Sequence, residues 1–206
     1  MNQEALTVSD SVLVARFQFD GETEAFNILH RRYRTRILNY LYRYLRNYHR
    51  AEELTQETFI RVYRNLPGFK MTGKVSSWIY TIATNLARME VRKKKLGEVS
   101  SSGLFTKEGE EINLLDSIPN HTKRPDRVAQ AREIEMRVQK TIAAMPEKYR
   151  EVFILCAIQG LSHEEAATTL HLRMGTAWSR LHRARKIFAR ELGINPEKPL
   201  GAELTW

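Results

Sequence analysis

Residues 162–190 read SHEEAATTLHLRMGTAWSRLHRARKIFAR, and this stretch decides the fold of the region around it. Ser162 and Glu165 fit the S-x-x-E pattern of a capping box, which starts a helix. Residues 171–174 predict a short turn, and a second helix begins at Gly175. The inward positions of that second helix are small or apolar, namely Ala177, Leu181, Ala184 and Phe188. Two short helices joined by a tight turn predict a helix-turn-helix.

The outward side of the second helix is strongly basic. Its residues are Trp178, Ser179, Arg180, His182, Arg183, Arg185, Lys186 and Arg190. Five of these eight are Arg or Lys, and only one acid, Glu191, follows nearby. A basic recognition helix of this kind lies in the major groove of duplex DNA. The alternative is an ordinary helical hairpin with a solvated basic face, and the excess of cations favours the DNA-binding interpretation.

The rest of the chain is also predicted to be helical. Apolar residues recur at spacings of three and four in four further segments. These stripes are Phe26, Leu29, Tyr33, Ile37, Leu41 and Tyr44; Phe59, Val62, Tyr63 and Leu66; Ile79, Ile82, Leu86 and Met89; and Ile134, Val138, Ile142 and Met145. Pro67-Gly68 and Pro146 end the second and fourth helices. No segment alternates as a strand does, so we expect an all-α fold.

A segment of different composition separates two halves of the chain. Residues 96–125 are rich in Ser, Gly and acid and carry a net charge of −2, whereas residues 1–95 carry +8 and residues 126–206 carry +3 of the total of +9. This pattern predicts two small helical domains joined by a flexible acidic linker. The expected boundaries are 1–95 for the first domain, 96–127 for the linker, 128–193 for the second domain and 194–206 for a C-terminal tail.

Composition excludes several classes of protein. The hydrophobic fraction of 42% and the charged fraction of 28% are those of a soluble globular protein. The longest apolar run, Val152 to Ile158, is far shorter than the ~20 residues that span a bilayer. The N-terminus lacks the pattern of a secretion signal. The lone cysteine, Cys156, cannot form an internal disulfide and is predicted to fill the core. We therefore expect a cytoplasmic protein with no direct membrane insertion.

Enzyme motifs are missing from the sequence. His163-Glu164 begins like the zinc-protease motif H-E-x-x-H, but Ala167 stands where the second histidine is required. No phosphate-binding loop, no G-x-S-x-G and no pair of catalytic carboxylates is found. We expect no catalytic residues, no metal site, no cofactor and no small-molecule substrate.

Residues 77–95 are predicted to form a helix with a second, polar stripe. The stripe consists of Thr81, Asn85, Arg88, Arg92 and Lys95. It offers donors for phosphates and an amide that can pair with a base edge. Upstream, the loop FKMTGKVSSWIY at 69–80 carries Lys70, Lys74 and Trp78, and such loops can enclose an unstacked base. The alternative, which the pattern leaves open, is a solvated helix face with Trp78 in the core.

An acidic patch lies inside the most basic third of the chain. Glu52, Glu53, Gln56 and Glu57 fall on one face of the predicted helix AEELTQETFIRVYRNL. Acids near a helix N-terminus favour its dipole, but this explains one or two of them rather than the whole patch. The patch suits a basic protein partner better than DNA.

In these residues the chain resembles the bacterial RNA polymerase sigma factors of the extracytoplasmic-function (ECF) type, in the sigma-70 family. In the first domain the resemblance is carried by GETEAF at 21–26, by AEELTQETFIRVYRNL at 51–66 and by SSWIYTIATNLAR at 76–88. In the second domain it is carried by MPEKYREVFIL, GLSHEEAA and GTAWSRLHRARK. The motifs cover nearly the whole chain and stand in the family's order.

The resemblance implies two helical domains with separate tasks. Region 2 binds core RNA polymerase and opens the minus-ten element of the promoter, and region 4 reads the minus-thirty-five element as duplex. Carried over by position, the polymerase-binding residues are Glu52, Leu54, Gln56, Glu57 and Phe59. The minus-ten residues are Lys70, Lys74, Trp78, Thr81, Asn85, Arg88 and Arg92. The minus-thirty-five residues are Thr176, Trp178, Ser179, Arg180, His182, Arg183 and Lys186.

The resemblance also implies partners. They are core RNA polymerase, through its beta-prime clamp helices and beta flap, promoter DNA, and an anti-sigma factor that can hold the protein near the inner membrane. Five positions depart from the family's usual residues: Met89, Ala166, His171, Ala177 and Trp178. Because Trp178 falls on the reading face, the minus-thirty-five preference is the least transferable property.

Two other functions are compatible with a helix-turn-helix. A stand-alone repressor or activator needs a dimer to read two half-sites, and no heptad or apolar dimer face is found. A recombinase needs a Ser or Tyr nucleophile among clustered arginines, and no such constellation is present. A footprint on DNA without polymerase distinguishes the first of these from a sigma factor.

Overall fold

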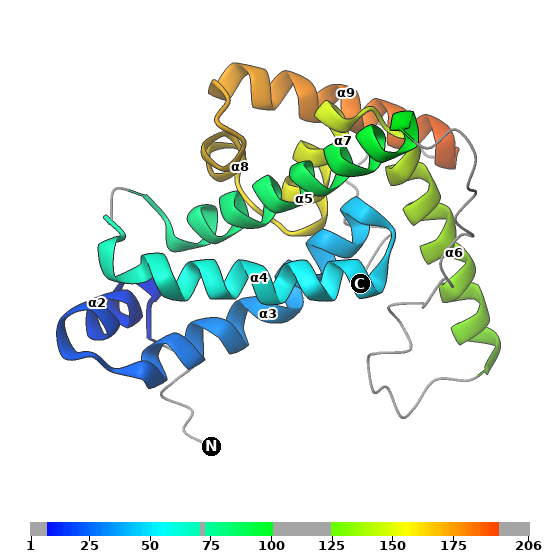
Figure 1. Ribbon diagram of the computed structural model, residues 1–206. Helices are drawn as coiled ribbons and strands as arrows, with labels where there is room; N and C mark the ends of the chain where they lie inside the picture. The colour runs from blue at the N-terminus through cyan, green and yellow to red at the C-terminus, as the bar shows by residue number, and fades with distance from the viewer. Residues whose placement is uncertain (1–7, 71–72, 101–124, 194–206) are drawn as a thin grey trace. The chain divides into compact units, whose positions relative to one another are not determined.

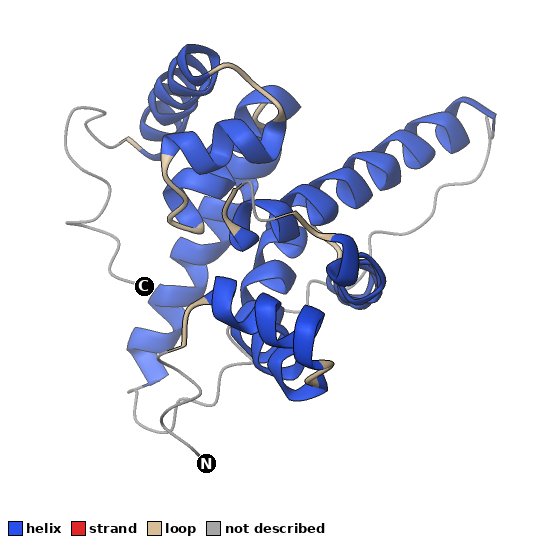
Figure 2. Ribbon diagram, turned by 90° about the vertical axis from the view of Figure 1, so that its left-hand side faces the viewer, coloured by secondary structure: helices blue, strands red, loops and turns tan. Residues whose placement is uncertain are grey.

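The computed structural model describes residues 8–70, 73–100 and 125–193, and every regular element in these ranges is a helix (Figures 1 and 2). The helices fall into two compact units, which confirms the expected all-α fold with two helical domains. The first unit holds α2 to α5 and the second holds α6 to α9. The predicted linker and tail lie largely outside the described residues.

In the first unit, α2 (Asp10–Asp20), α3 (Thr23–Leu45), α4 (Tyr48–Asn65), the short 3₁₀ helix η1 (Leu66–Gly68) and α5 (Val75–Ser100) form one bundle. Ser9 caps the start of α2, and Asp10 accepts hydrogen bonds from Arg32 and Tyr33 of α3. The stripe predicted for α3 is confirmed, because Leu29, Tyr33, Ile37, Leu41 and Tyr44 are buried and only Phe26 is half-buried.

The centre of this bundle is aromatic. The rings of Tyr40 and Tyr80 meet edge to face at 5.6 Å, and the hydroxyl groups of Tyr40 and Thr84 are 2.8 Å apart. Burial of large rings with a satisfied hydroxyl group fixes α3 against α5. A second aromatic group joins α4 to the same bundle, because Tyr63 packs on Phe17 of α2 and on Phe26 of α3.

Helix α5 differs from its prediction in two respects. It begins at Val75 and continues to Ser100, five residues into the predicted linker, because KKKLGEVS contains good helix formers and only one glycine. Its buried face is also rotated: Ala83, Thr84 and Ala87 are buried, whereas Met89 is 47% exposed. The prediction that Met89 belongs to the core is wrong, because the buried face of α5 follows Tyr80 and Thr84, which contact Tyr40 of α3, and Met89 lies away from that face.

The second unit contains α6 (Pro125–Ala144), α7 (Glu147–Phe153), the π-helix η3 (Ile154–Ile158), α8 (His163–Leu170) and α9 (Met174–Leu192). The fourth stripe is confirmed at Val138, Ile142 and Met145, but Ile134 is 46% exposed and its predicted burial is wrong. Glu135, the next residue along α6, is buried instead, so the inward face of the helix is rotated by one position there.

The end of α6 is satisfied by a side chain from α7. Arg150 donates from Nη2 to the carbonyl oxygens of Ala143 and Met145 at 2.6 and 2.9 Å. The last carbonyl groups of a helix have no partner within it, so these two bonds cap α6 and tie it to α7.

The helix-turn-helix is confirmed in detail. The Ser162 hydroxyl accepts from the Glu165 backbone N–H while the Glu165 carboxylate accepts from that of Ser162, which is the predicted capping box. His171 ends α8 in the left-handed region at φ 54°, so the turn is made without glycine. All four inward residues predicted for the second helix are buried, and Phe188 packs on Phe153 of α7 with ring centroids 4.6 Å apart.

Candidate nucleic-acid interface

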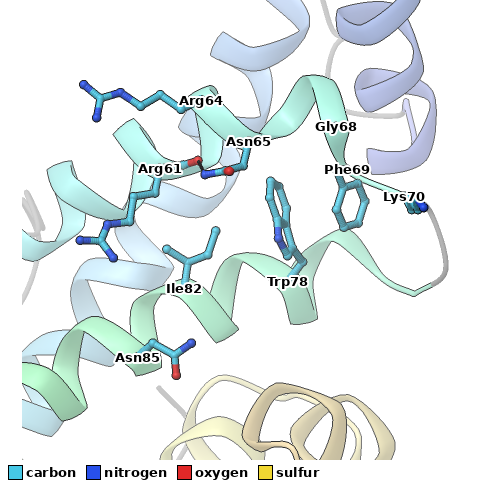
Figure 3. A pocket seen from close by; sticks show the side chains of 9 residues that line it. All are labelled: Arg61, Arg64, Asn65, Gly68, Phe69, Lys70, Trp78, Ile82 and Asn85. Carbon is cyan, nitrogen blue, oxygen red and sulfur yellow. Dashed lines mark hydrogen bonds between the residues drawn. The ribbon is translucent and has the colours of Figure 1, made fainter.

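A pocket opens where α4 ends and α5 begins (Figure 3). Its volume of about 560 Å³ lies in the usual range of pockets for small organic groups. The lining residues are Arg61, Arg64, Asn65, Gly68, Phe69, Lys70, Trp78, Ile82 and Asn85. Three of them are cationic, two are amides and none is acidic. The pocket therefore offers an apolar surface together with donors for an anionic ligand.

Two stacked rings form its apolar wall. Phe69 and Trp78 lie with ring centroids 4.4 Å apart and an interplanar angle of 29°. Trp78 is in the first turn of α5, where its backbone N–H donates to the Lys74 carbonyl, and Phe69 directly follows η1. Pro67 ends α4 because it has no N–H to continue the helix, and the chain then turns back along α5. Aromatic walls of this kind accept an unstacked base.

The structure brings together three of the seven predicted minus-ten residues in the pocket, namely Lys70, Trp78 and Asn85. Thr81 is half-buried and donates to the Ser77 carbonyl at 2.8 Å, and Arg88 is half-buried. Lys74 and Arg92 are exposed and do not line the pocket.

Sequence reasoning missed the contribution of α4. Arg61, Arg64 and Asn65 line the pocket from the last turn of that helix, and Phe69 supplies half of the aromatic wall. The turn signal Pro67-Gly68 indicated that the chain reverses there, but it did not indicate which faces of α4 and α5 meet.

The predicted acidic face on α4 is present but its charges are largely paired within the chain. Glu57 accepts from Arg61 Nε at 2.6 Å, and Glu52 lies 3.7 Å from Arg34. Glu53 accepts from Nη1 of Arg50, and Nη2 of the same guanidinium group donates to Glu90 of α5 at 2.7 Å. That hydrogen bond from Arg50 holds the pKa of the Glu90 carboxyl below its usual range. The bridge from Arg50 thus ties α4 to α5 while the outer carboxylates stay accessible.

Two predicted polymerase-binding residues lie in the core. Leu54 is 6% exposed and Phe59 is 4% exposed. Phe59 packs edge to face on His30 of α3, with ring centroids 4.6 Å apart. These residues hold α4 in place, so of the five predicted residues only Glu52, Gln56 and Glu57 are within reach of a partner.

Helix α9 presents the predicted reading face to solvent. Trp178 and His182 are exposed and stack with an interplanar angle of 2° and centroids 5.7 Å apart. Arg183 is exposed and donates to the Tyr149 hydroxyl of α7 at 3.4 Å, which lowers the pKa of Tyr149. Ser179 and Lys186 are exposed, and Thr176 and Arg180 are half-buried. All seven predicted residues therefore lie on or beside one outward face.

Other kinds of site find no support among the described residues. Within ranges 8–70, 73–100 and 125–193, no group of three His, Cys, Asp or Glu side chains is placed to hold a metal ion. No helix in the same part of the chain is long and apolar enough to cross a membrane. Burial raises the pKa of the Cys156 thiol to about 11, so it is protonated at neutral pH and unsuited to nucleophilic chemistry.

Comparison with known families agrees with this geometry. A family model described as Sigma-70 region 2 matches residues 29–96, and one described as Sigma-70, region 4 matches residues 135–187. The ECF RNA polymerase sigma factor SigW of Bacillus subtilis is 34% identical over 84% of this chain and 91% of its own. The RNA polymerase sigma-H factor of Pseudomonas aeruginosa is 32% identical over 89% of this chain and 93% of its own.

Solved structures share the fold. CnrH, in a complex with the cytosolic domain of CnrY, has a TM-score of 0.64 at 23% identity and covers 89% of this chain and 97% of its own. The sigma factor RpoE of Bartonella quintana, in a complex with the anti-sigma factor NepR, has a TM-score of 0.67 at 23% identity and covers 82% and 98%. The two family models and the curated relatives show that the chain belongs to the extracytoplasmic-function sigma factors of the sigma-70 family, with region 2 in its first helical unit and region 4 in its second.

Proposed function

We propose that the chain binds core RNA polymerase and directs promoter-specific initiation, with no catalytic activity of its own. The observation that carries this proposal is the pocket of the first unit, in which cations and amides surround the Phe69–Trp78 wall. Such a pocket fits one unpaired base and its phosphates, which an opened promoter supplies. The domains are assigned as residues 1–95 for region 2, 96–127 for the linker, 128–193 for region 4 and 194–206 for a tail.

The second unit supplies duplex recognition. Helix α9 is held by its buried inward face and presents Trp178, His182 and Arg183 outward. Arg183 is suited to pair with a guanine edge, and Arg180 and Lys186 are suited to hold phosphates. Because a single helix-turn-helix makes few contacts, region 4 alone binds weakly and the polymerase complex provides the affinity.

The exposed face Glu52, Gln56 and Glu57 of α4 is assigned to the basic clamp helices of polymerase, and region 4 to the beta flap. The same surfaces are the ones an anti-sigma factor would cover. RpoE of Bartonella quintana, which shares the fold, is bound to an anti-sigma factor, and this supports an anti-sigma partner for the present chain. An anti-sigma factor that is anchored in the membrane would hold this cytoplasmic protein at the inner membrane.

Run-off transcription over genomic fragments tests the function as a whole. Purified protein with core polymerase is expected to give discrete transcripts that neither component gives alone. If no template yields a transcript, the proposal is wrong, and a footprint on DNA without polymerase would instead support a stand-alone regulator.

Glu57→Lys is expected to weaken binding to core polymerase about tenfold or more, since it places a cation opposite a basic surface. The internal cost is modest, because the change removes the exposed Glu57–Arg61 ion pair and adds a like-charge pair at i, i+4, each worth about 0.2–0.5 kcal/mol. Affinity is measured by titrating labelled protein with core polymerase. The matched control is Glu191→Lys, which changes the net charge equally at an exposed position of α9. Equal loss in both variants would mean that only net charge matters.

Arg183→Ala is expected to reduce discrimination between the cognate minus-thirty-five duplex and a mismatched one by about 1–3 kcal/mol. Lys186→Ala is expected to weaken binding to both duplexes alike and to lower the salt slope by about one. Tyr149→Phe removes the hydroxyl group that Arg183 contacts but keeps the arginine. It therefore separates the effect of losing this contact from the effect of losing Arg183 itself. The assay is competition transcription on the two promoters. Equal loss of activity on both promoters in Arg183→Ala would show that Arg183 contacts phosphate rather than a base.

A further inference from the structure

The turn at one end of the pocket is held by a side chain from another helix. Gln18 of α2 donates from Nε2 to the carbonyl oxygen of Leu66 at 2.7 Å and to that of Phe69 at 2.9 Å. A longer contact of 3.4 Å reaches the Pro67 carbonyl oxygen. No motif marks Gln18 in the sequence, because its partners lie 48 to 51 residues away.

These carbonyl groups can each accept two hydrogen bonds, and the Leu66 oxygen has one backbone donor, the Phe69 N–H. They lie at the end of α4 and η1, where the helix leaves its last C=O groups without partners in the following turn. Pro67 supplies no N–H, and the backbone bond at this turn runs from the Phe69 N–H to the Leu66 carbonyl at 3.2 Å. A glutamine amide has two N–H groups, which matches the two short bonds from Gln18.

Phe69, whose carbonyl oxygen accepts from Gln18, also forms half of the aromatic wall of the pocket. Phe69 leaves the turn with an extended backbone, and its ring stacks on Trp78 (Figure 3). The Gln18 bond to the Phe69 carbonyl therefore fixes the backbone from which that ring projects. We propose that Gln18 is a positioning residue, which holds the Phe69–Trp78 wall at the pocket in the geometry that accepts an unpaired nucleotide base. This inference rests on the proposed function of the pocket.

Two substitutions separate hydrogen bonding from packing. Gln18→Met keeps the length and shape of the side chain but removes both donors. Gln18→Glu keeps the shape and places acceptors against the carbonyl oxygens, so it should be the more harmful. A side chain that acted through packing alone would tolerate methionine. The matched control is Ser9→Ala, which removes the N-cap of the same helix α2 but does not touch the turn.

The experiment uses the full chain with Trp178 and Trp206 changed to Phe, so that Trp78 is the only one of the three tryptophans left to report. Two quantities are measured for each variant: quenching of Trp78 by acrylamide, and quenching by single-stranded decamers of deoxyadenosine, thymidine or deoxycytidine. Stacking of a base on Trp78 is expected to quench its emission in the parent protein. Thermal melting checks that each variant is folded.

We expect Gln18→Met to bind the best decamer about tenfold more weakly than the parent protein does, and Gln18→Glu to bind it more weakly still. A tenfold loss lies in the lower part of the range for losing one base–aromatic stack. Acrylamide should reach Trp78 more readily in both, whereas Ser9→Ala should stay within about twofold of the parent. Parent-like binding or parent-like acrylamide access in Gln18→Met would overturn the inference, as would equal loss in Ser9→Ala. If no decamer quenches the parent protein, the proposed function of the pocket fails, and the acrylamide result still decides whether Gln18 positions the wall.

Discussion

Phe188→Ala is expected to unfold the second unit while the first stays folded. Phe188 is 1% exposed and packs on Phe153 across α7 and α9. Truncating a buried phenylalanine costs about 3–5 kcal/mol, through lost burial and the cavity that remains. A helical unit of this size has a core that rarely supplies more than about 3–5 kcal/mol of net stability. The loss is therefore of the same size as the whole stability of the unit.

Thermal unfolding followed by circular dichroism measures this effect. Loss of one transition with the other unchanged is the expected result, together with loss of minus-thirty-five recognition. His182→Ala, on the exposed face of the same helix, serves as the control and should melt like the parent. A single transition that shifts as a whole would show that the two units do not unfold independently, and a change below about 1 kcal/mol would contradict the cavity argument.

Trp78→Ala is expected to abolish most promoter opening. The substitution removes half of the aromatic wall, and a base–aromatic stack is worth about 1–3 kcal/mol, which corresponds to a loss of roughly five- to 150-fold. Polymerase binding should be unchanged, because Trp78 lies on α5 whereas the assigned polymerase face lies on α4. Transcription from a duplex promoter by the reconstituted complex measures the effect, and a gel-shift with core polymerase measures assembly.

Two further variants sharpen the result for Trp78. Trp78→Phe keeps a ring on Phe69 and should recover part of the activity. Ile82→Ala trims the same pocket without touching the stack and should lose less than Trp78→Ala. Equal loss of assembly and opening in Trp78→Ala would contradict the separation of the two surfaces.

The second unit was the more predictable of the two from sequence. Its architecture depends on local signals: the Ser162 capping box, a short turn, and an inward stripe that ends at Phe188. Each signal acts within a few residues, so periodicity and capping are enough to find it. The turn residue His171 is the exception, since its left-handed backbone is typical of glycine or asparagine.

The first unit was less predictable because its site depends on tertiary contacts. Hydrophobicity assigned Met89 to the core, yet the buried face of α5 contains the small residues Ala83 and Ala87 while Met89 is exposed. The pocket is lined by Arg61 of α4 and by Asn85 of α5, and Gln18 reaches a turn far along the chain. The residue types indicated nucleic-acid binding, but neither spacing nor composition shows which side chains from separate helices meet.

The carboxylates on the outer face of α4 are already neutralised within the chain, Glu57 by Arg61 and Glu52 by Arg34. A basic partner that docks here does not meet bare negative charge, because it competes with an arginine for each carboxylate. The electrostatic gain is then the difference between two similar ion pairs, and salt weakens both of them. Such an exchange gives little affinity by itself, so a complex at this face must draw on further contacts, for which Gln56 and the exposed Ile60 are available on the same helix.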